Sequence, residues 1–465
     1  MRFFDRELEL AELKEAEALS RKKKFVIALY GLRRVGKTRL LLEFLKGRGI
    51  YFFVNRNKTS SDLLAEYQSI LRENGLLGGL EVLDSWEAFV RVITEREAPP
   101  IVFDEFQNLS FVEPSVFGML QKNLDLNEGV PGLIIVSGSL IGFLKRFFRS
   151  SKEPLYGRIK KSRKVEPLPL RSCFEIGAEL KLEKEELVKL YLLFGGYPKY
   201  YVAIEDFGLQ GQTAEEIVNA LFLAKDAPLE DEVNGILSQE FGGRSGIYYS
   251  ILESIASGNN TLSSIAGSLN TPVTSITRQA NELKDLFEII ELETPYEGKR
   301  GAYRIRHPLL EFWFSQIYRN YSDYSARKPE FVRSVKNNLN AFYGKRFERA
   351  AAEFLSPALA LTEAKRQWGK IPGGKKGENA YEIDLVGRNA QAAYAFEFKW
   401  KRLGWREAEK ILEELKAKAR HLQSPIDGMK FGVVAKSIDD KRRLADQGYL
   451  AYDLRDFQFP SWARL

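Results

Sequence analysis

The sequence predicts an α/β protein that begins with a parallel sheet and ends with a second α/β module. From Phe25 to about residue 170, apolar segments of strand length alternate with amphipathic helical segments, which is the order of a parallel sheet with crossover helices. Residues 172 to about 240 then read as mostly helical. After residue 380, two segments in which apolar and polar residues alternate predict a half-buried β-hairpin. These observations favour two α/β regions separated by helices.

The composition limits the chemistry that the chain can perform. A length of 465 residues exceeds what one hydrophobic core can organise, so we expect several domains. One Cys and two His exclude intrachain disulfides, Cys-based zinc sites and multi-histidine metal sites. Any bound metal is therefore expected to be a hard cation whose ligands are carboxylates.

The charge balance and the N-terminus bear on partners and location. Lys and Arg number 70 against 63 Asp and Glu, a net charge of +7 that allows a nucleic-acid partner where the basic residues cluster. Few Cys and Met beside many charged residues are typical of a heat-adapted protein. The N-terminus has no apolar signal region, and no run of about 18 apolar residues occurs. We therefore expect a cytoplasmic protein with no membrane partner.

The first expected strand, Phe25–Tyr30, leads into a phosphate-binding motif. Gly31-Leu32-Arg33-Arg34-Val35-Gly36-Lys37-Thr38 has the spacing of a P-loop and precedes an apolar-periodic helix. Its glycines let the backbone N–H groups face a phosphate. Lys37 is expected to contact the β- and γ-phosphates of ATP, and Thr38 to bind Mg²⁺. The residues expected to bind ATP or ADP in this segment are Gly31, Arg33, Arg34, Val35, Gly36, Lys37, Thr38 and Arg39.

Three further strands are expected, at Ile50–Val54, Pro100–Phe103 and Leu133–Val136. Asp104 follows the second of these, where a Walker B aspartate holds Mg²⁺ through water, and Glu105 is placed to orient or deprotonate the attacking water.

Two further residues of this region are weaker candidates for contacts with the nucleotide. Ser137 follows the last expected strand and is a candidate γ-phosphate sensor, although a turn of small residues explains it equally well. Arg158 is a candidate for stabilising transition-state charge, in cis or from another subunit. The basic run Lys160–Lys164 makes a plain solvated surface the alternative.

These motifs resemble the archaeal AAA-type ATPase family within the STAND class of signal-transduction NTPases. The match extends over essentially the whole chain. It implies that Arg6 and Glu7 lie near the adenine and that Pro198 packs on the nucleotide from a helical lid. The sequence features that support the resemblance are Phe4–Leu10, the Arg-Arg pair of the P-loop, Asp104–Gln107, Pro154–Arg158, Gly195–Pro198 and Phe312–Phe314.

The pattern of residues 246–306 predicts three helices, as in a helix-turn-helix, followed by a pair of strands. This order is typical of a winged helix. Its third helix begins near Thr271 and exposes Thr274, Ser275, Thr277 and Arg278, which suit contacts with bases or phosphates. The expected wing carries four basic residues, Lys299, Arg300, Arg304 and Arg306. The alternative is a packing or lid module without DNA contact. His307 is either a phosphate sensor or a structural histidine.

The C-terminal hairpin carries a cluster of ionisable residues. Tyr381–Gly387 and Ala393–Trp400 should pair so that Asp384 and Glu397 meet, with Lys399 on the face of Glu397. Carboxylates that bind Mg²⁺ beside a Lys suit phosphodiester hydrolysis, and Glu348 upstream is a candidate third ligand. The region resembles the PD-(D/E)xK nuclease fold, although Ile383 stands where that fold usually has Pro. Many proteins of this fold bind DNA without cutting it.

The resulting prediction has four modules. These are a P-loop NTPase core of the AAA-like type (residues 1–170), a helical lid (171–240), a winged-helix domain (241–330) and an α/β restriction-endonuclease-like domain (331–465). The first hypothesis is a Mg²⁺-dependent ATPase that binds DNA and controls the nuclease-like domain. The alternative is a STAND-type switch that forms homo-oligomers under nucleotide control, with a DNA-binding tail that is not catalytic.

Overall fold

A computed structural model describes residues 1–139, 142, 153–241, 246–371, 373, 379–424 and 428–458. Its contacts divide the chain into two compact units. The first consists of Met1–Leu168, Tyr197–Lys199 and Asn281–Glu288, and the second of Pro169–Gly196, Tyr200–Ala280 and Ile289–Leu465. The first unit ends close to the predicted boundary at residue 170. Apart from Tyr197–Lys199 and Asn281–Glu288, which belong to the first unit, the residues of the predicted modules 171–240, 241–330 and 331–465 lie in the second unit, where the long helix α18 (Pro329–Ala358) packs against both the helical region and the C-terminal sheet.

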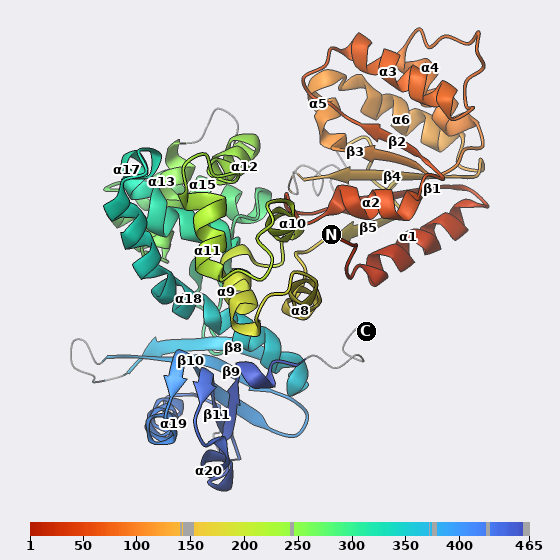
Figure 1. The fold of residues 1–465 in the computed structure, drawn as a ribbon. Coiled ribbons are helices and arrows are strands. Elements are labelled where there is room, and N and C mark those ends of the chain that lie inside the picture. Colours follow the sequence, from red (N-terminus) through yellow and green to blue (C-terminus); the bar gives the residue numbers. More distant parts are fainter. Residues whose placement is uncertain are drawn as a thin grey trace. The chain divides into compact units, whose positions relative to one another are not determined.

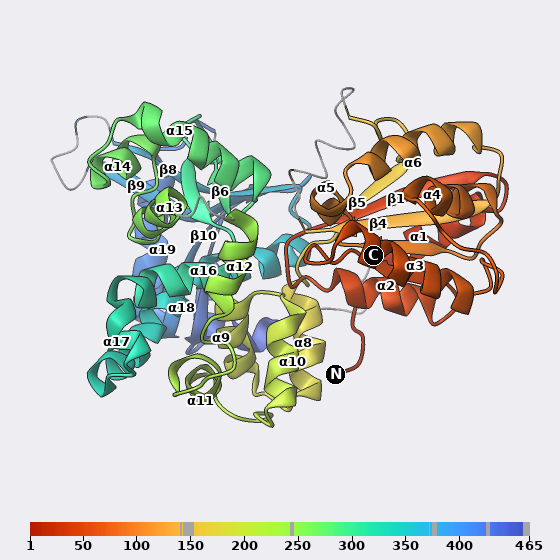
Figure 2. The same ribbon diagram turned by 90° about the horizontal axis from the view of Figure 1, so that it is seen from above.

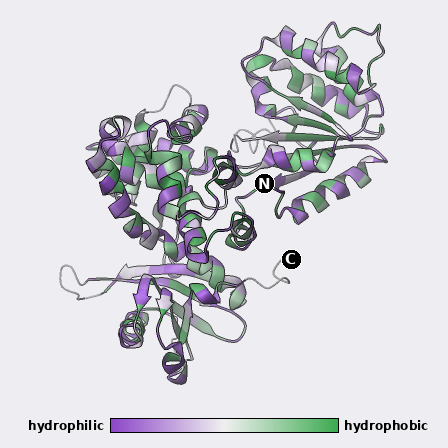
Figure 3. Cartoon of the chain, in the orientation of Figure 1, coloured by the Kyte–Doolittle hydropathy of each residue, from purple (hydrophilic) through white to green (hydrophobic). Residues whose placement is uncertain are grey.

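The first unit is built on a five-stranded sheet in the order β2-β3-β4-β1-β5, in which every strand pair is parallel. All residues of the central strands β1 and β4 are buried, and these strands are mostly hydrophobic (Figure 3). Such continuous apolar runs are expected where helices cover both faces of a parallel sheet. The strands are β1 (Lys24–Tyr30), β2 (Ile50–Phe53), β3 (Ile101–Asp104), β4 (Gly132–Gly138) and β5 (Lys161–Lys164).

Helices cover both faces of this sheet (Figure 1). One face packs under α3 (Ser60–Glu73), α4 (Trp86–Glu95) and α6 (Ser115–Leu126), around the buried ring of Phe52. On the other face α1 (Glu7–Ser20) packs against β1 and β4 beside α2 (Lys37–Leu45). The short helices η1 (Phe106–Asn108) and α5 (Leu109–Val112) follow β3. The four strands predicted from the sequence correspond to β1 to β4, so the carboxyl ends of β1, β3 and β4 meet at one edge.

Strand β5 was not predicted. Its residues belong to the basic run Lys160–Lys164, for which a solvated surface is the alternative given above, yet they form an edge strand in which Lys164 pairs with Tyr30 of β1. An edge strand tolerates charged side chains because one of its sides is open. Here those side chains meet carboxylates of α1, with Lys161 at 2.9 Å from Glu15 and Arg163 at 3.2 Å from Glu12.

The second unit begins with helices and continues into a three-helix group followed by the antiparallel hairpin of β6 (Ile290–Glu293) and β7 (Ala302–Ile305). The three helices of that group are α13 (Gly246–Ala256), α14 (Leu262–Ser268) and α15 (Val273–Asn281), which lie together in Figure 2. The helices before them are α8 (Leu170–Glu179), α9 (Lys184–Phe194), α10 (Pro198–Asp206), α11 (Ala214–Val218), η2 (Asn219–Leu223) and α12 (Glu232–Phe241). The remaining helices up to α18 are η3 (Glu282–Leu286), α16 (Pro308–Phe312), η4 (Trp313–Ile317), η5 (Tyr318–Asn320) and α17 (Tyr321–Ser325).

The C-terminal part of this unit is a five-stranded mixed sheet in the order β12-β11-β10-β9-β8. Strands β8, β9 and β10 are antiparallel neighbours, whereas β10, β11 and β12 are parallel. Helix α18 packs on β10, and α19 (Trp405–Ala419) connects β10 to β11. The strands are β8 (Glu363–Lys370), β9 (Ala380–Arg388), β10 (Ala393–Leu403), β11 (Lys430–Ile438) and β12 (Leu450–Asp453), with α20 (Lys441–Asp446) and η6 (Leu454–Asp456) near the end. Among the described residues, no helix has the length and apolar character needed to cross a bilayer.

Candidate nucleotide site and C-terminal carboxylate cluster

The predicted phosphate-binding motif forms a loop between β1 and α2. Its backbone turns through two left-handed conformations, at Arg34 (φ 69°) and at Gly36 (φ 92°), the second of which glycine adopts without strain. Lys37 is only 6% exposed, and its ammonium donates to the carbonyl oxygens of Gly31 (2.9 Å) and Leu32 (3.0 Å). The loop therefore encloses a positive charge at the N-terminus of a helix, an arrangement that attracts phosphate.

Arg6 supports this loop from the segment before α1. It is 6% exposed and donates to the backbone oxygens of Val35 (2.9 Å) and Glu166 (2.7 Å), while its guanidinium also pairs with Glu9 at 3.1 Å. The loop is tightly packed, because a Cβ on Gly31 would lie 2.3 Å from the carbonyl oxygen of Val165. Arg6 thus holds the loop in shape.

The other residues expected at the nucleotide fall into two groups. Pro198 lies beside the loop, since its Cγ would be 3.7 Å from a Cβ on Gly36, and Val35 is fully buried. Glu7, Arg34, Thr38 and Arg39 are exposed, and Arg33 is partly buried.

Asp104 joins the loop to the neighbouring strand. Its Oδ2 accepts hydrogen bonds from the hydroxyl of Thr38 at 2.6 Å and from the hydroxyl of Tyr51 at 2.9 Å. Burial and the Asp104 carboxylate raise the pKa of Tyr51, so this hydroxyl stays protonated and can donate. The sequence did not identify Tyr51, whose place in β2 shows no pattern beyond that of an ordinary strand.

Glu105 stands at the same edge in a left-handed conformation (φ 54°) that a residue with a side chain rarely adopts. Its Oε2 accepts from the hydroxyl of Ser139 at 3.0 Å and from the side-chain amide of Gln107. The prediction for Ser137 needs correction. Ser137 is fully buried within β4 without a hydrogen-bond partner among the described residues, and Ser139 is the serine that reaches Glu105.

Arg158 does not lie near the phosphate loop. Its guanidinium pairs with Asp125, with N–O distances of 2.7 and 3.0 Å, at the end of α6. The N–H of Lys160, two residues on, donates to Val26 near the start of β1, so Arg158 lies at the amino ends of the strands, opposite the phosphate loop. A role for Arg158 in cis is therefore wrong, and a role at another copy's site stays a prediction.

This geometry matches the needs of ATP with Mg²⁺. The ammonium of Lys37 is enclosed by the loop, and the hydroxyl of Thr38 and the carboxylate of Asp104 lie together next to it, which is a donor set suited to a hard divalent cation. Glu105 adds a carboxylate that accepts hydrogen bonds and faces the same edge. A strand, a phosphate loop, a helix and this pair at the end of a neighbouring strand define the class of P-loop ATPases.

Comparison with known proteins agrees with this class. Residues 3–204 match an ATPase domain found predominantly in Archaea, and residues 313–411 match a domain of archaeal and bacterial proteins of unknown function. An uncharacterized protein of Methanocaldococcus jannaschii is 29% identical over 464 residues, which cover 98% of this chain and 100% of that protein. The first part of the chain is therefore similar to an archaeal ATPase domain, which agrees with the P-loop that it contains.

Two solved structures are also similar. The Walker-type ATPase of Pyrococcus abyssi is 23% identical with a TM-score of 0.52, and the match covers 67% of this chain and 96% of that one. This likeness supports the fold. The ORC2 protein of Aeropyrum pernix, solved as ADPNP–ADP complexes, is 14% identical with a TM-score of 0.45, and the match covers 72% of this chain and 96% of that one.

The C-terminal hairpin brings together the three residues that the sequence predicted there. The register of β9 and β10 pairs Phe396 with Leu385, so Glu397 and Asp384 follow as neighbours. Asp384 accepts a hydrogen bond from the backbone N–H of Phe398 at 2.7 Å. The Lys399 ammonium lies 2.8 Å from Glu397 and 3.7 Å from Asp384.

The two carboxylates of this cluster differ in protonation. Burial, and then the charge of Glu397, raise the pKa of Asp384 to about 7. Burial also opposes ionisation of Glu397, but the ammonium groups of Lys399 and Lys418 outweigh it and hold the pKa of Glu397 below its ordinary value. Lys418, which lies on α19 at 2.5 Å from Glu397, was not predicted as part of the site. Glu397 therefore loses its proton at a lower pH than Asp384 does.

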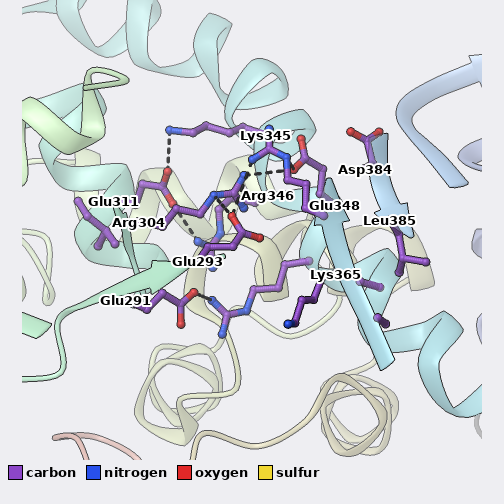
Figure 4. Close-up of a pocket in the computed structure, with 15 residues that line it drawn as sticks. Glu291, Glu293, Arg304, Glu311, Lys345, Arg346, Glu348, Lys365, Asp384 and Leu385 are labelled. Atoms are coloured by element: carbon purple, nitrogen blue, oxygen red, sulfur yellow. Dashed lines mark hydrogen bonds and ion pairs between the residues drawn. The ribbon is translucent and has the colours of Figure 1, made fainter. Parts of the chain in front are cut away.

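Glu348 lies nearby on α18 and lines a cavity of about 170 Å³ together with Asp384 (Figure 4). Burial and the charge of Asp384 raise the pKa of Glu348 to about 7. Its carboxylate faces the guanidinium groups of Arg304 at 3.4 Å and Arg366 at 3.7 Å.

The predicted Mg²⁺ ligands Glu348, Asp384 and Glu397 do not fit a metal ion as they are arranged. Each oxygen of Glu397 is bound by a lysine, Lys399 on one and Lys418 on the other. Within the described residues, no three His, Cys, Asp or Glu side chains are grouped to hold a metal.

The basic residues of the β6–β7 hairpin are also placed differently from the prediction. Arg304 pairs with Glu293 at 2.9 Å and Arg306 with Glu291 at 3.5 Å, so these two arginines are not displayed to solvent as a free wing. Lys299 and Arg300 are exposed, as are Thr274, Ser275 and Arg278 of α15, whereas Thr277 is partly buried.

His307 is structural rather than a phosphate sensor. It is fully buried within 3.4 Å of the Tyr200 hydroxyl, and burial together with the charge of Arg346 lowers its pKa to about 3.

Proposed function

We propose that this protein is a Mg²⁺-dependent ATPase whose nucleotide state controls a DNA-binding second unit. The observation that carries the proposal is the gathering of Lys37, Thr38, Asp104 and Glu105 at one edge of a parallel sheet. ATP with Mg²⁺ would supply the phosphoryl group that is transferred, and the negative charge of its phosphates is what the cationic groups of the site would neutralise.

The chain's own residues divide the work of hydrolysis. When ATP binds, the Lys37 ammonium donates to phosphate oxygens in place of the loop carbonyl oxygens. The hydroxyl of Thr38 and the carboxylate of Asp104 are the groups that would hold the cation. Glu105 accepts the proton of the attacking water or orients it. Ser139 and Gln107, which both donate to Glu105, fix the direction of its carboxylate.

The order of elements in the second unit supports the DNA-binding part of the proposal. Three helices followed by an antiparallel hairpin is the order of a winged helix, and the exposed polar and basic residues of α15 suit contacts with DNA. The order α18-β8-β9-β10-α19-β11, with Asp384, Glu397 and Lys399 on adjacent strands, is similar to the order expected for a restriction-endonuclease-like fold and supports that part of the proposal.

Stimulation of the ATPase by DNA tests the proposal. We expect linear or forked DNA to raise the rate of phosphate release from ATP, because DNA and nucleotide bind to a coupled protein. We also expect DNA affinity to fall steeply with salt, since counterions are released from phosphates on binding. The measurements are steady-state phosphate release with and without DNA and fluorescence anisotropy across a salt series. If no form of DNA changes the ATPase rate and self-association depends on ATP or ADP, the result would instead support the regulatory-switch hypothesis.

Phosphodiester cleavage is a second candidate activity, favoured by the Asp384, Glu397 and Lys399 cluster. If the cluster is catalytic, Asp384→Ala should abolish cleavage of linear, forked or single-stranded DNA in Mg²⁺ or Mn²⁺, because it removes a carboxylate from the reacting centre. Asp446→Ala, on the exposed face of α20, is the matched control and should cleave like the parent. No cleavage by the parent under any of these conditions, or equal cleavage by Asp384→Ala, would leave the C-terminal sheet as a binding module.

A further inference from the structure

The carboxylate of Asp104 is held by three hydrogen-bond donors. Its Oδ2 accepts from the hydroxyl groups of Thr38 (2.6 Å) and Tyr51 (2.9 Å), and its Oδ1 accepts from the backbone N–H of Glu105 at 3.0 Å. A carboxylate offers about four lone-pair positions to donors or cations. The contacts of the described residues therefore occupy both positions on Oδ2 and leave one position, on Oδ1.

One of these donors comes from a strand that is not otherwise part of the nucleotide site. Thr38 lies in the first turn of α2, and Glu105 follows Asp104 directly in the chain. Tyr51 instead lies on β2, which carries none of the residues expected at the nucleotide. Its hydroxyl can therefore be removed while the phosphate loop and the Asp104–Glu105 pair keep their sequence.

The register of the sheet explains why a tyrosine is needed at this position. β2 runs parallel to β3 and pairs Tyr51 with Val102 and Phe53 with Asp104. Tyr51 thus stands two residues before the partner of Asp104 and on the same face of the sheet, about 6.6 Å away along the strand direction. A long side chain that ends in a donor spans this distance. Phenylalanine would keep the ring and lose only the donor.

The position that remains on Asp104 limits which cations it serves well. Mg²⁺ requires a near-ideal octahedron and usually keeps several waters, whereas Ca²⁺ takes more oxygen ligands and often binds both oxygens of one carboxylate. Because Thr38 and Tyr51 cover Oδ2, Asp104 cannot bind a cation through both of its oxygens. One position is enough to accept a hydrogen bond from the water shell of Mg²⁺, but it disfavours Ca²⁺.

We propose that Tyr51 sets the cation preference of the nucleotide site: its hydroxyl occupies Oδ2 of Asp104, restricts this carboxylate to one further contact and thereby favours Mg²⁺ over Ca²⁺. Tyr51 acts through Asp104 and is a positioning residue. The inference deepens the proposed function, on which it rests, by naming the residue that discriminates between divalent cations.

The test measures how much each cation tightens the binding of a non-hydrolysable ATP analogue to the full chain. Affinity is titrated by calorimetry in EDTA, in Mg²⁺ and in Ca²⁺, for the parent and for Tyr51→Phe. We expect the ratio of the Mg²⁺ gain to the Ca²⁺ gain to fall about three- to tenfold in Tyr51→Phe, the change that corresponds to about one hydrogen bond. The affinity of each cation for the analogue itself is common to both proteins and cancels. Affinity in EDTA should stay like that of the parent.

Tyr67→Phe is the matched control. The Tyr67 hydroxyl donates to the carbonyl of Phe53 in the same strand at 3.2 Å, rather than to Asp104. This variant should keep the parent's ratio. An equal fall of the ratio in Tyr67→Phe and Tyr51→Phe would trace the effect to a general loosening of β2 and overturn the proposal.

Competition between the two cations during hydrolysis gives a second readout. Ca²⁺ added to the Mg²⁺-dependent reaction should inhibit phosphate release at lower concentrations in Tyr51→Phe than in the parent, because the freed position on Asp104 accommodates Ca²⁺ better. Equal inhibition of both proteins would contradict the role of Tyr51.

The outcomes separate this inference from the function on which it rests. If neither cation changes the parent's affinity for the analogue, the cation site is absent and both proposals fail. If Mg²⁺ tightens binding to the parent and Tyr51→Phe keeps or raises the parent's ratio, the role of Tyr51 fails and the Mg²⁺-dependent ATPase stands.

Discussion

Replacement of Lys37 with alanine is expected to lower the rate of ATP hydrolysis by about 10²–10³-fold. The reason is electrostatic, since the Lys37 ammonium is enclosed by the phosphate loop and is the cation placed to stabilise the charge that develops on the transferred phosphoryl group. The measurement is steady-state phosphate release at saturating ATP, together with nucleotide affinity from isothermal titration. We expect affinity to fall as well, because the same ammonium contacts the ground-state phosphates.

Lys46→Ala is the matched control for that variant. Lys46 follows α2, the helix that Lys37 begins, and its side chain is 67% exposed. It should hydrolyse ATP at the parent's rate. Parent-like hydrolysis by Lys37→Ala, with the fold intact by circular dichroism, would contradict the assignment of the nucleotide site to this loop.

Glu105→Gln is expected to lower kcat by about 10²–10⁴-fold while ATP binding stays close to that of the parent. The amide keeps the size of the side chain but cannot accept a proton, whereas the residues that hold the phosphates and the cation are unchanged. Single-turnover hydrolysis and a separate binding titration distinguish the two effects. Tight ATP binding with slow hydrolysis would also make this variant the natural form in which to study the ATP-bound state.

Glu97→Gln tests whether any loss of a glutamate has the same effect. Glu97 is exposed before β3, at the opposite end of the strand from Glu105. It should behave like the parent. If Glu105→Gln hydrolyses ATP normally, Glu105 neither orients nor deprotonates the attacking water, and its contacts with Ser139 and Gln107 are only structural.

Much of the nucleotide site could be predicted because its residues follow strands with strong local patterns. β1, β3 and β4 read as apolar runs, and parallel strands place their carboxyl ends at one edge, so Lys37, Asp104 and Glu105 meet without any knowledge of the rest of the chain. The pairing of Asp384 with Glu397 follows in the same way from one hairpin and its alternation.

The errors have two physical causes. Arg158 was misplaced because the charged strand β5 hides its strand character, and recognition of that strand would have put Arg158 at its amino end. Tyr51, Lys418 and the docking of Arg304 depend on contacts between residues far apart in sequence. The alternation of apolar and polar residues predicts which face of a strand a side chain occupies. It does not predict which residue of another element contacts that side chain.

The composition of the first unit has a consequence for how this protein can be divided. Its residues come from three separate stretches of chain, and the two short ones supply Pro198 beside Gly36 and Glu288 beside Lys164. A fragment that ends at residue 168 would lose both. An exchange of the ATPase part between proteins is therefore expected to keep these contacts only if the two short stretches are carried along.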